Sequence, residues 1–375
     1  MLYNSLLILS ILLISSHAHS SNKTSMNLYY GYATSDNLAR NKIDKIKGNY
    51  SNLEANITGK SLLHMNHNLL YRGGFKTKRH INDLHADNFD ENLGTAELGN
   101  QIRVGKTQIL GLQTHYLNYS GRTIDFQTNS TEGRDSRFSE IGAGLGWQNL
   151  FKPFSRNLDF TLKIFYLERD YKTFANDENG NLFEDDYLAK GIEMENQYQV
   201  TNRLLLQIKP EYKIKSYSDR RSRFTEGTID NSKRNPFQEL AIWSVTNKIE
   251  YTANFVKMFI LHNFTFQDDK AFGALDNDGN IYSFGMEFPI TSFASFRPTF
   301  TTGKHRYETF VADVINNPQS LEKRVDEISS LDIPIELNLP FIKIILSYQK
   351  QKITSNYPLE GFDEEKYEIG IKYEL

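Results

Sequence analysis

The feature that most constrains this chain is a two-residue alternation of apolar and polar side chains that recurs along its length. In residues 333–339, isoleucine or leucine occupies every odd position, and in residues 342–348 an apolar side chain occupies every even position. A β-strand turns successive side chains to opposite faces, so each such segment has one apolar and one polar face. The pattern therefore predicts a protein built from strands with two differently solvated faces.

Sixteen segments show this alternation, and several are longer than ten residues. Strands of soluble domains average about five or six residues, whereas about nine to eleven residues cross a bilayer on a tilt. The predicted strands lie near residues 26–34, 49–58, 61–75, 94–104, 108–119, 136–148, 158–173, 186–200, 203–217, 237–251, 255–267, 280–289, 294–306, 327–339, 341–354 and 365–375. Their length favours a membrane barrel over a secreted β-sandwich or propeller, in which strands also alternate.

The connections between the predicted strands are of two kinds. Short turns, such as 58–60 and 339–340, alternate along the chain with longer polar loops, such as 120–135 and 218–236. Bacterial outer-membrane barrels have this asymmetry, with tight turns on the periplasmic side and longer loops outside. The sequence therefore predicts an all-β protein, a transmembrane antiparallel up-and-down β-barrel of about 16 strands, with about 14 strands as the alternative.

Aromatic residues near the ends of the predicted strands indicate two membrane interfaces. At the long-loop ends we expect a lipid-facing girdle that includes Tyr71, Tyr119, Tyr171 and Tyr217. Some polar residues conflict with this pattern, because they fall on the expected lipid-facing side of their strands. They are His67, Asn100, Asn196 and Asn247.

The first twenty residues differ in composition from the rest of the chain. Residues 6–14 form an apolar run too short to span a bilayer as a helix, and the small residues Ala18 and Ser20 follow at the spacing that a signal peptidase requires. We therefore expect residues 1–20 to be a signal peptide cleaved near Ser20. Residues 21–375 are then expected to form the barrel.

Composition and motifs exclude several other classes of protein. The chain has no cysteine, which rules out disulfides, thiolate metal sites, cysteine nucleophiles and a lipoprotein anchor. Lys and Arg number 43 against 46 Asp and Glu, so charge gives no case for nucleic acid as a partner. The sequence contains no nucleophile elbow, phosphate loop or His-Glu-x-x-His motif. We therefore expect neither an enzyme nor a cofactor.

One polar loop is the strongest candidate for a chemical site. It carries His80, Asp83, His85 and Asp87. Two imidazoles and two carboxylates so close in sequence can hold a divalent metal ion, or act as acid–base pairs in an outer-membrane hydrolase. A solvated polar loop has the same composition, and we favour that interpretation.

The segment 368–375 reads EIGIKYEL and resembles the C-terminal β-signal of bacterial outer-membrane barrels. Gly370, Tyr373 and Leu375 occupy the positions that this signal fixes, although many members of the family end in phenylalanine. The resemblance implies that the barrel-assembly machinery recognises this segment and that the last strand pairs with the first. It also implies an outer-membrane location, with membrane lipids and lipopolysaccharide as surroundings.

The polar faces of the predicted strands carry many charges, and we expect these to line a water-filled interior because dry unpaired charges are costly. The expected pore-lining residues are Arg72, Arg103, Lys163, Arg169, Glu193, Glu195, Lys209, Glu211, Lys213, Lys215, Arg297 and Lys343. The three lysines 209, 213 and 215 follow one strand beside another that carries two of the glutamates. Such strips either set up a field across the pore or neutralise each other by pairing.

The function predicted most directly is a porin-like channel for passive diffusion of small hydrophilic solutes. The alternative is a surface barrel associated with exopolysaccharide export or adhesion. Residues 30–37, which read YGYATSDN, resemble the first strand of some barrels linked to exopolysaccharide systems. An outer-membrane hydrolase is favoured least, and a homo-oligomer is compatible with each interpretation.

Overall fold

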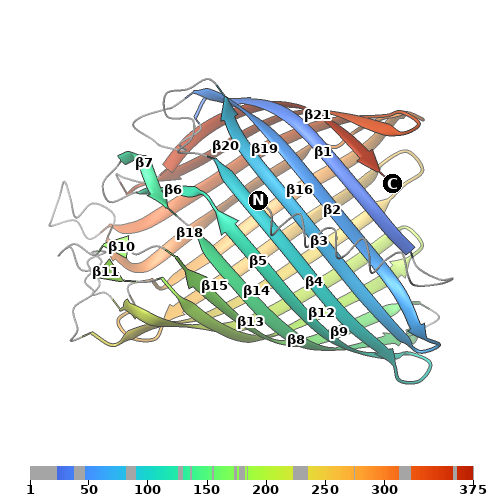
Figure 1. Ribbon diagram of the computed structural model, residues 1–375, viewed down its shortest axis with the longest axis horizontal. Coiled ribbons are helices and arrows are strands. Elements are labelled where there is room, and N and C mark those ends of the chain that lie inside the picture. Colours follow the sequence, from blue (N-terminus) through green and yellow to red (C-terminus); the bar gives the residue numbers. More distant parts are fainter. Residues whose placement is uncertain are drawn as a thin grey trace.

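The computed structural model of the chain describes residues 23–37, 47–81, 90–125, 130–135, 137–153, 156–172, 175–176, 182–183, 185–222, 235–273, 275–311, 322–357 and 361–374. Most of these residues form one closed antiparallel barrel whose strands run obliquely to its long axis (Figure 1). In this part of the chain, no helix is long and apolar enough to cross a membrane.

The barrel wall is one sheet in which each strand pairs with its neighbours along the chain, so the topology is up-and-down. Its strands are β1 (Lys23–Ser35), β2 (Gly48–His64), β3 (His67–Ile81), β4 (Glu91–Arg103), β5 (Gln108–Ser120), β8 (Phe138–Phe151), β9 (Leu158–Tyr171), β12 (Tyr187–Thr201), β13 (Leu204–Arg221), β14 (Phe237–Thr252), β15 (Lys257–Asp269), β16 (Asn277–Thr291), β17 (Ala294–Phe296), β18 (Thr299–Val311), β19 (Lys323–Asn338), β20 (Ile342–Ser355) and β21 (Gly361–Glu374). Two small two-stranded sheets stand outside the wall. They are β6 (Arg122–Asp125) with β7 (Ser130–Asp135), and β10 (Ala175–Asn176) with β11 (Leu182–Phe183).

The strands β17 and β18 form one interrupted wall strand, since both lie between β16 and β19. The wall therefore has sixteen strand positions, and the predicted fold class is confirmed. The interruption falls at Arg297 and Pro298. The strand predicted near 294–306 is therefore present but interrupted, at a proline that has no backbone N–H to donate to the sheet ladder.

The barrel closes where β1 meets β21. The two strands pair antiparallel from Asn27 opposite Glu374 to Ser35 opposite Lys366. Closure of the wall gives the outermost strands partners on both sides, so their backbone groups need no water. The last described strand thus pairs with the first, as the resemblance of residues 368–375 implies, while Leu375 lies outside the described residues.

The two ends of the barrel differ in their connections (Figure 1). The end on the left of the figure carries β6, β7, β10 and β11 between the wall strands, whereas the right end carries short turns and the end of β21. One predicted turn, at 58–60, is wrong, because β2 continues to His64 and the turn follows at residues 65–66. Gly59 is paired inside the strand with Thr24 of β1 and Tyr71 of β3, and the ring of Tyr71 lies over it, 2.1 Å from where a Cβ would stand.

The two faces of the wall differ as the alternation predicts. On the outer face large apolar side chains are exposed, among them Ile141, Leu145 and Ile164 at 62%, 63% and 58%. Side chains of the opposite parity, such as Glu140 and Lys163, face the interior and bond there to residues of other wall strands. So large an exposed apolar face is unfavourable in water and suits the hydrocarbon of a bilayer.

Polar residues on the outer face bond to one another. His67 and Asn100 form a hydrogen bond between β3 and β4. On β14 to β16, Asn247 donates to His262 Nδ1 at 3.4 Å, and His262 Nε2 donates to Asn280 at 3.2 Å. These bonds account for three of the four polar positions that conflict with the alternation, because a paired polar group costs less in hydrocarbon than an unpaired one.

Candidate functional site

Charged side chains on the inward face of β12 and β13 pair with each other. Lys209 Nζ lies 3.0 Å from a carboxylate oxygen of Glu193, and Lys213 Nζ lies 2.8 Å from Glu211. The first pair bridges two strands and the second lies along one strand. Of the two alternatives drawn from the sequence, the positions of these two lysines favour local pairing over a strip of free positive charge.

The remaining members of this predicted group have other partners. Lys215 Nζ lies 4.7 Å from the ring centroid of Tyr187, in a cation–π contact. Among the described residues, Lys215 makes no ion pair with a carboxylate. Glu195 accepts a hydrogen bond from Gln207 at 2.8 Å. Lys215 and Glu195 thus contact neutral partners, and within the described ranges neither forms an ion pair.

Farther around the wall, the predicted residues also lie in ion pairs. Arg297, beside the break between β17 and β18, lies 3.2 Å from Glu287 and 3.1 Å from Glu336. Lys343 on β20 lies 3.1 Å from Glu374 on β21. These pairs join neighbouring strands, so this part of the inward face is close to electrically neutral.

The inward face of β5, β8 and β9 carries a cluster of aromatic rings. Phe138 lies between Tyr119 and Tyr171, with ring centroids 5.2 Å apart in each pair. The guanidinium of Arg169 covers Phe138 at 4.2 Å and pairs with Glu140 at 2.5 Å. The expectation that Tyr119 and Tyr171 belong to a lipid-facing girdle is therefore wrong. Both tyrosines have the parity of the charged residues on their strands, which turns them inward.

Two other tyrosines of the predicted girdle are also placed differently. Tyr217 packs against Tyr187 on the inward face in a tilted arrangement, with ring centroids 5.5 Å apart. Tyr71 lies near the short-turn end of β3, and its hydroxyl is 2.6 Å from that of Thr24. The place of an aromatic residue in the sequence therefore did not predict which face of the wall, or which end of the barrel, it lies on. Both depend on the strand register.

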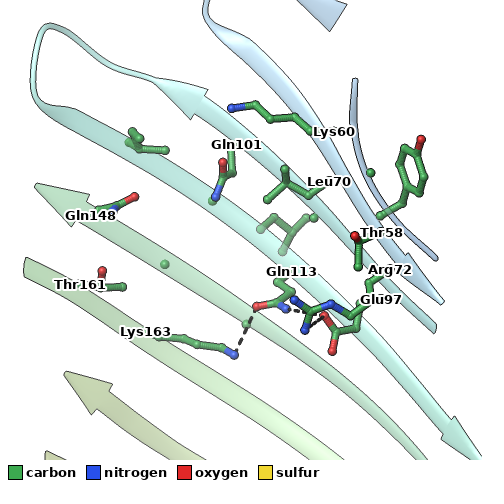
Figure 2. Close-up of a pocket in the computed structure, with 18 of the residues that line it drawn as sticks. Thr58, Lys60, Leu70, Arg72, Glu97, Gln101, Gln113, Gln148, Thr161 and Lys163 are labelled. Carbon is green, nitrogen blue, oxygen red and sulfur yellow. Dashed lines mark hydrogen bonds and ion pairs between the residues drawn. The ribbon is translucent and has the colours of Figure 1, made fainter. Parts of the chain in front are cut away.

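The inward face of the wall from β1 to β9 is hollowed by a cavity of about 620 Å³ on the side of the short turns (Figure 2). The charged residues in its lining are four cations and a single carboxylate, namely Lys23, Lys60, Arg72, Lys163 and Glu97. Its carboxamides, which both donate and accept hydrogen bonds, are Gln101, Gln113 and Gln148. This cavity is the candidate site, because it combines charge, neutral polar groups and open volume.

Side chains from four strands form a continuous chain across the cavity (Figure 2). Arg72 on β3 lies 3.6 Å from Glu97 on β4, which accepts a hydrogen bond from Gln113 of β5 at 3.5 Å. Lys163 on β9 donates a hydrogen bond from Nζ to the side-chain amide oxygen Oε1 of Gln113 at 3.3 Å. The Arg72 side chain is 63% exposed, so most of its N–H groups still face open space. The chain therefore ends in a cation on each side.

The sequence indicated only part of this site. Arg72 and Lys163, two of the expected pore-lining residues, lie in the cavity lining. Arg103 lies at the short-turn end of β4 and outside that lining. Sequence reasoning missed Lys60 and the three glutamines. Isolated glutamines form no recognisable sequence motif. The residues of this lining are far apart in the chain, and only the sheet register brings them together.

The predicted metal site is not assembled within the described part of the chain. Asp83, His85 and Asp87 lie outside the described residues. His80, near the end of β3, is buried, with Nδ1 3.4 Å from Asp90 and its ring 5.6 Å from that of Tyr50. In the described ranges no three His, Cys, Asp or Glu side chains group together in a way that can hold a metal ion.

Comparison with known proteins identifies the fold. No protein-family model matches the chain, and no curated protein matches it in sequence. Among solved structures, the chain is similar to CdiB from Acinetobacter baumannii, with a TM-score of 0.53 at 10% identity over 94% of this chain and 60% of CdiB. The chain thus spans less than two thirds of the length of CdiB.

Two further structures have TM-scores of 0.50. One is OmpT of Vibrio cholerae without its loop L8, at 9% identity over 95% of this chain and 100% of that chain. The other is FauA, the alcaligin outer-membrane receptor of Bordetella pertussis, at 10% identity over 96% of this chain and 76% of that chain. The chain therefore has the fold of bacterial outer-membrane β-barrels. At such low identity the likeness concerns the fold and not a particular activity.

Proposed function

We propose that the protein is an outer-membrane channel for the passive diffusion of small hydrophilic solutes. A single observation carries this proposal, namely a closed sixteen-stranded wall with an apolar outer face and a charged, amide-rich inward face around a cavity. Charged groups such as those inside this barrel are costly to bury dry, so water is the medium that best suits the interior. Polar solutes then cross in water, without catalysis and without a cofactor.

The same proposal orients the barrel in the membrane. The short-turn end faces the periplasm and the long connections face outside, as is usual for outer-membrane barrels. The apolar outer face then contacts membrane lipids and lipopolysaccharide. The assembly machinery is proposed to recognise β21, which is supported by the resemblance of residues 368–375 and by the pairing of Gly370 and Tyr373 with β1.

Purified protein inserted into planar lipid bilayers tests the channel. We expect stepwise increases of current in potassium chloride, and swelling of liposomes in solutions of small sugars. Protein unfolded by boiling before reconstitution is the control and should give neither signal. Folded barrels that insert into the bilayer and carry no current would contradict the proposal.

Charge reversal tests whether the inward lysines lie beside the permeating ions. Replacing Lys209, Lys213 and Lys215 together by glutamate should shift the reversal potential in a salt gradient toward cation selectivity. The shift should be largest at low ionic strength, where screening is weak. The matched triple replacement by arginine keeps the charge and should leave the reversal potential unchanged. An unchanged potential in the glutamate variant would place these residues away from the ion path.

A further inference from the structure

Glycines in the barrel wall are of two kinds. At Gly59 and Gly142 a ring occupies the place of the missing Cβ, which would lie 2.1 Å from Tyr71 and 2.0 Å from His115. At Gly111 and Gly146 the nearest atoms would lie 3.7 and 3.8 Å from a Cβ, which is ordinary van der Waals contact. A side chain at either of the first two positions would therefore have to displace a ring, whereas the second two positions have room for a Cβ.

Some of the uncovered glycines lie together on the floor of the cavity. Gly111 and Gly146 are register partners across β5 and β8, and both belong to the cavity lining, as does Gly99 on β4. Glycine weakens a strand interior, and in strands it often marks a place where a ligand approaches the backbone closely. The bare backbone at this floor leaves room for a molecule that lies flat against the wall.

The charge of the cavity indicates the sign of that molecule. Lys23 and Lys60 lie directly opposite each other on β1 and β2, and like charges so placed repel. In the described part of the chain neither lysine makes an ion pair, and Lys163 is bonded to the neutral Gln113. A concave wall with an excess of one sign attracts the opposite charge, and an anion between the lysines would relieve their repulsion.

We propose that this cavity is a binding site for small organic anions that carry hydroxyl groups, in the class of sugar acids and sugar phosphates. Lys163, the register partner of Gly146, binds the carboxylate or phosphate through a charge-assisted hydrogen bond, and Lys60 and Arg72 add to the positive potential that attracts the anion. The glutamine side chains exchange hydrogen bonds with the hydroxyl groups. The apolar edge of the solute lies on the bare backbone of Gly111 and Gly146. This inference rests on the proposed channel function, in which the cavity is a binding site along the permeation path of the solute.

Calorimetric titration of the detergent-solubilised barrel tests the site without any need for conduction. The probes are glucuronate and glucose 6-phosphate, with glucose as the uncharged control. We expect at least one of the two anions to bind, and the other to show whether carboxylate or phosphate is preferred. Glucose should bind at least about tenfold more weakly, because it lacks the charge-assisted bonds. Equal binding of glucose and both anions, or no binding of either anion, would overturn the proposal.

Two sets of variants locate the binding. Lys60→Gln combined with Lys163→Gln should lower the affinity for the anion about tenfold or more, most strongly at low salt. Gly146→Leu fills the floor and should abolish binding without unfolding the barrel. Gly94→Leu adds a leucine to the outer face of β4, where a Cβ has no atom within 4 Å, and this control for an added wall side chain should bind normally. Unchanged affinity in the lysine variant, or in a folded Gly146→Leu barrel, would overturn the assignment.

Conductance measured on the same preparations separates the two proposals. A barrel that conducts and binds none of the anions refutes the site and leaves the channel in place. A barrel that binds the anions and does not conduct refutes the channel, and the cavity is then a ligand site on a closed barrel.

Discussion

At the scale of single residues, a ring is packed on two glycines at the place where the barrel closes. Tyr29 lies over Gly31 and Gly370, which are partners across β1 and β21. The Tyr29 hydroxyl donates a hydrogen bond to Glu368, which also pairs with Lys366 at 2.6 Å. Any Cβ at either glycine would meet the Tyr29 side chain at 2.5 Å or less, so this close approach requires glycine at both positions.

We expect Gly370→Ala to lower the free energy of unfolding by about 1–3 kcal/mol, as overpacking of a tight contact does. The reason is that the new Cβ would stand 2.2 Å from the Tyr29 hydroxyl oxygen. Unfolding in urea, followed by the difference in gel mobility between folded and unfolded barrel, measures the effect. Gly111→Ala is the matched control, because its Cβ has 3.7 Å of clearance, and it should not destabilise the barrel. Equal losses in the two variants would contradict the packing argument.

At the scale of the strand, neighbouring residues of β13 face different media. Leu206 is exposed on the outer face, while the adjacent Gln207 faces inward and donates to Glu195 at 2.8 Å. An arginine at 206 would meet hydrocarbon, whereas an arginine at 207 would meet water and a carboxylate. The two positions thus form a matched pair for testing which face is buried in lipid.

Leu206→Arg should cost about 2–4 kcal/mol if the residue lies near the middle of the bilayer, and less toward its interfaces. Gln207→Arg should cost far less, since an arginine there can still donate to Glu195. Unfolding titrations of both variants in lipid vesicles give the comparison. A similar loss at both positions would mean that the register assigned to β13 is wrong, because a slip by one residue exchanges the two faces.

At the scale of the whole molecule, one pairing of strands far apart in sequence holds the cylinder together. β1 and β21 lie at opposite ends of the described chain and pair over nine residues of each strand. In an open sheet these two strands would be free edges, each with unpaired N–H and C=O groups exposed to lipid. Closure therefore depends on the complete wall, because the first and last strands can pair only when the strands between them are in place.

A disulfide across this pairing tests closure directly. Tyr30 and Ile371 are register partners, and directly opposite residues in antiparallel strands lie about 4.5–5.5 Å apart, within reach of a disulfide. The chain has no native cysteine, so Tyr30→Cys with Ile371→Cys should form one bond and keep the boiled, unreduced chain in a compact form on gels. Tyr30→Cys with Ile369→Cys is the register control and should form the bond poorly, because Ile369 lies opposite Tyr32. Efficient bonding only in the control would contradict the closure register.

Much of the fold could be predicted from the sequence, and less of the site. Long strands with one apolar face are local patterns, so their number and the identity of the outer face follow from the order of residues. The prediction of a turn at 58–60 was wrong because a glycine in a strand cannot be distinguished from a glycine in a turn by sequence alone. The pairing of Gly59 with Thr24 on β1 and Tyr71 on β3 shows that it lies in the strand.

The sequence alone determined a β-barrel with a polar inner face, because the two-residue alternation of apolar and polar side chains is a local property of each strand. The tertiary structure alone decided which inward side chains meet. Lys60, Gln113 and Lys163 share one cavity through the register of six strands, and that register is set by hydrogen bonds between separate strands. It also decided which glycines are covered by a ring and which are left bare, since the covering side chain comes from another strand. Pairing between strands is a non-local interaction. A single sequence therefore indicates which face of a strand is apolar, but not which residues of the next strand pair with it.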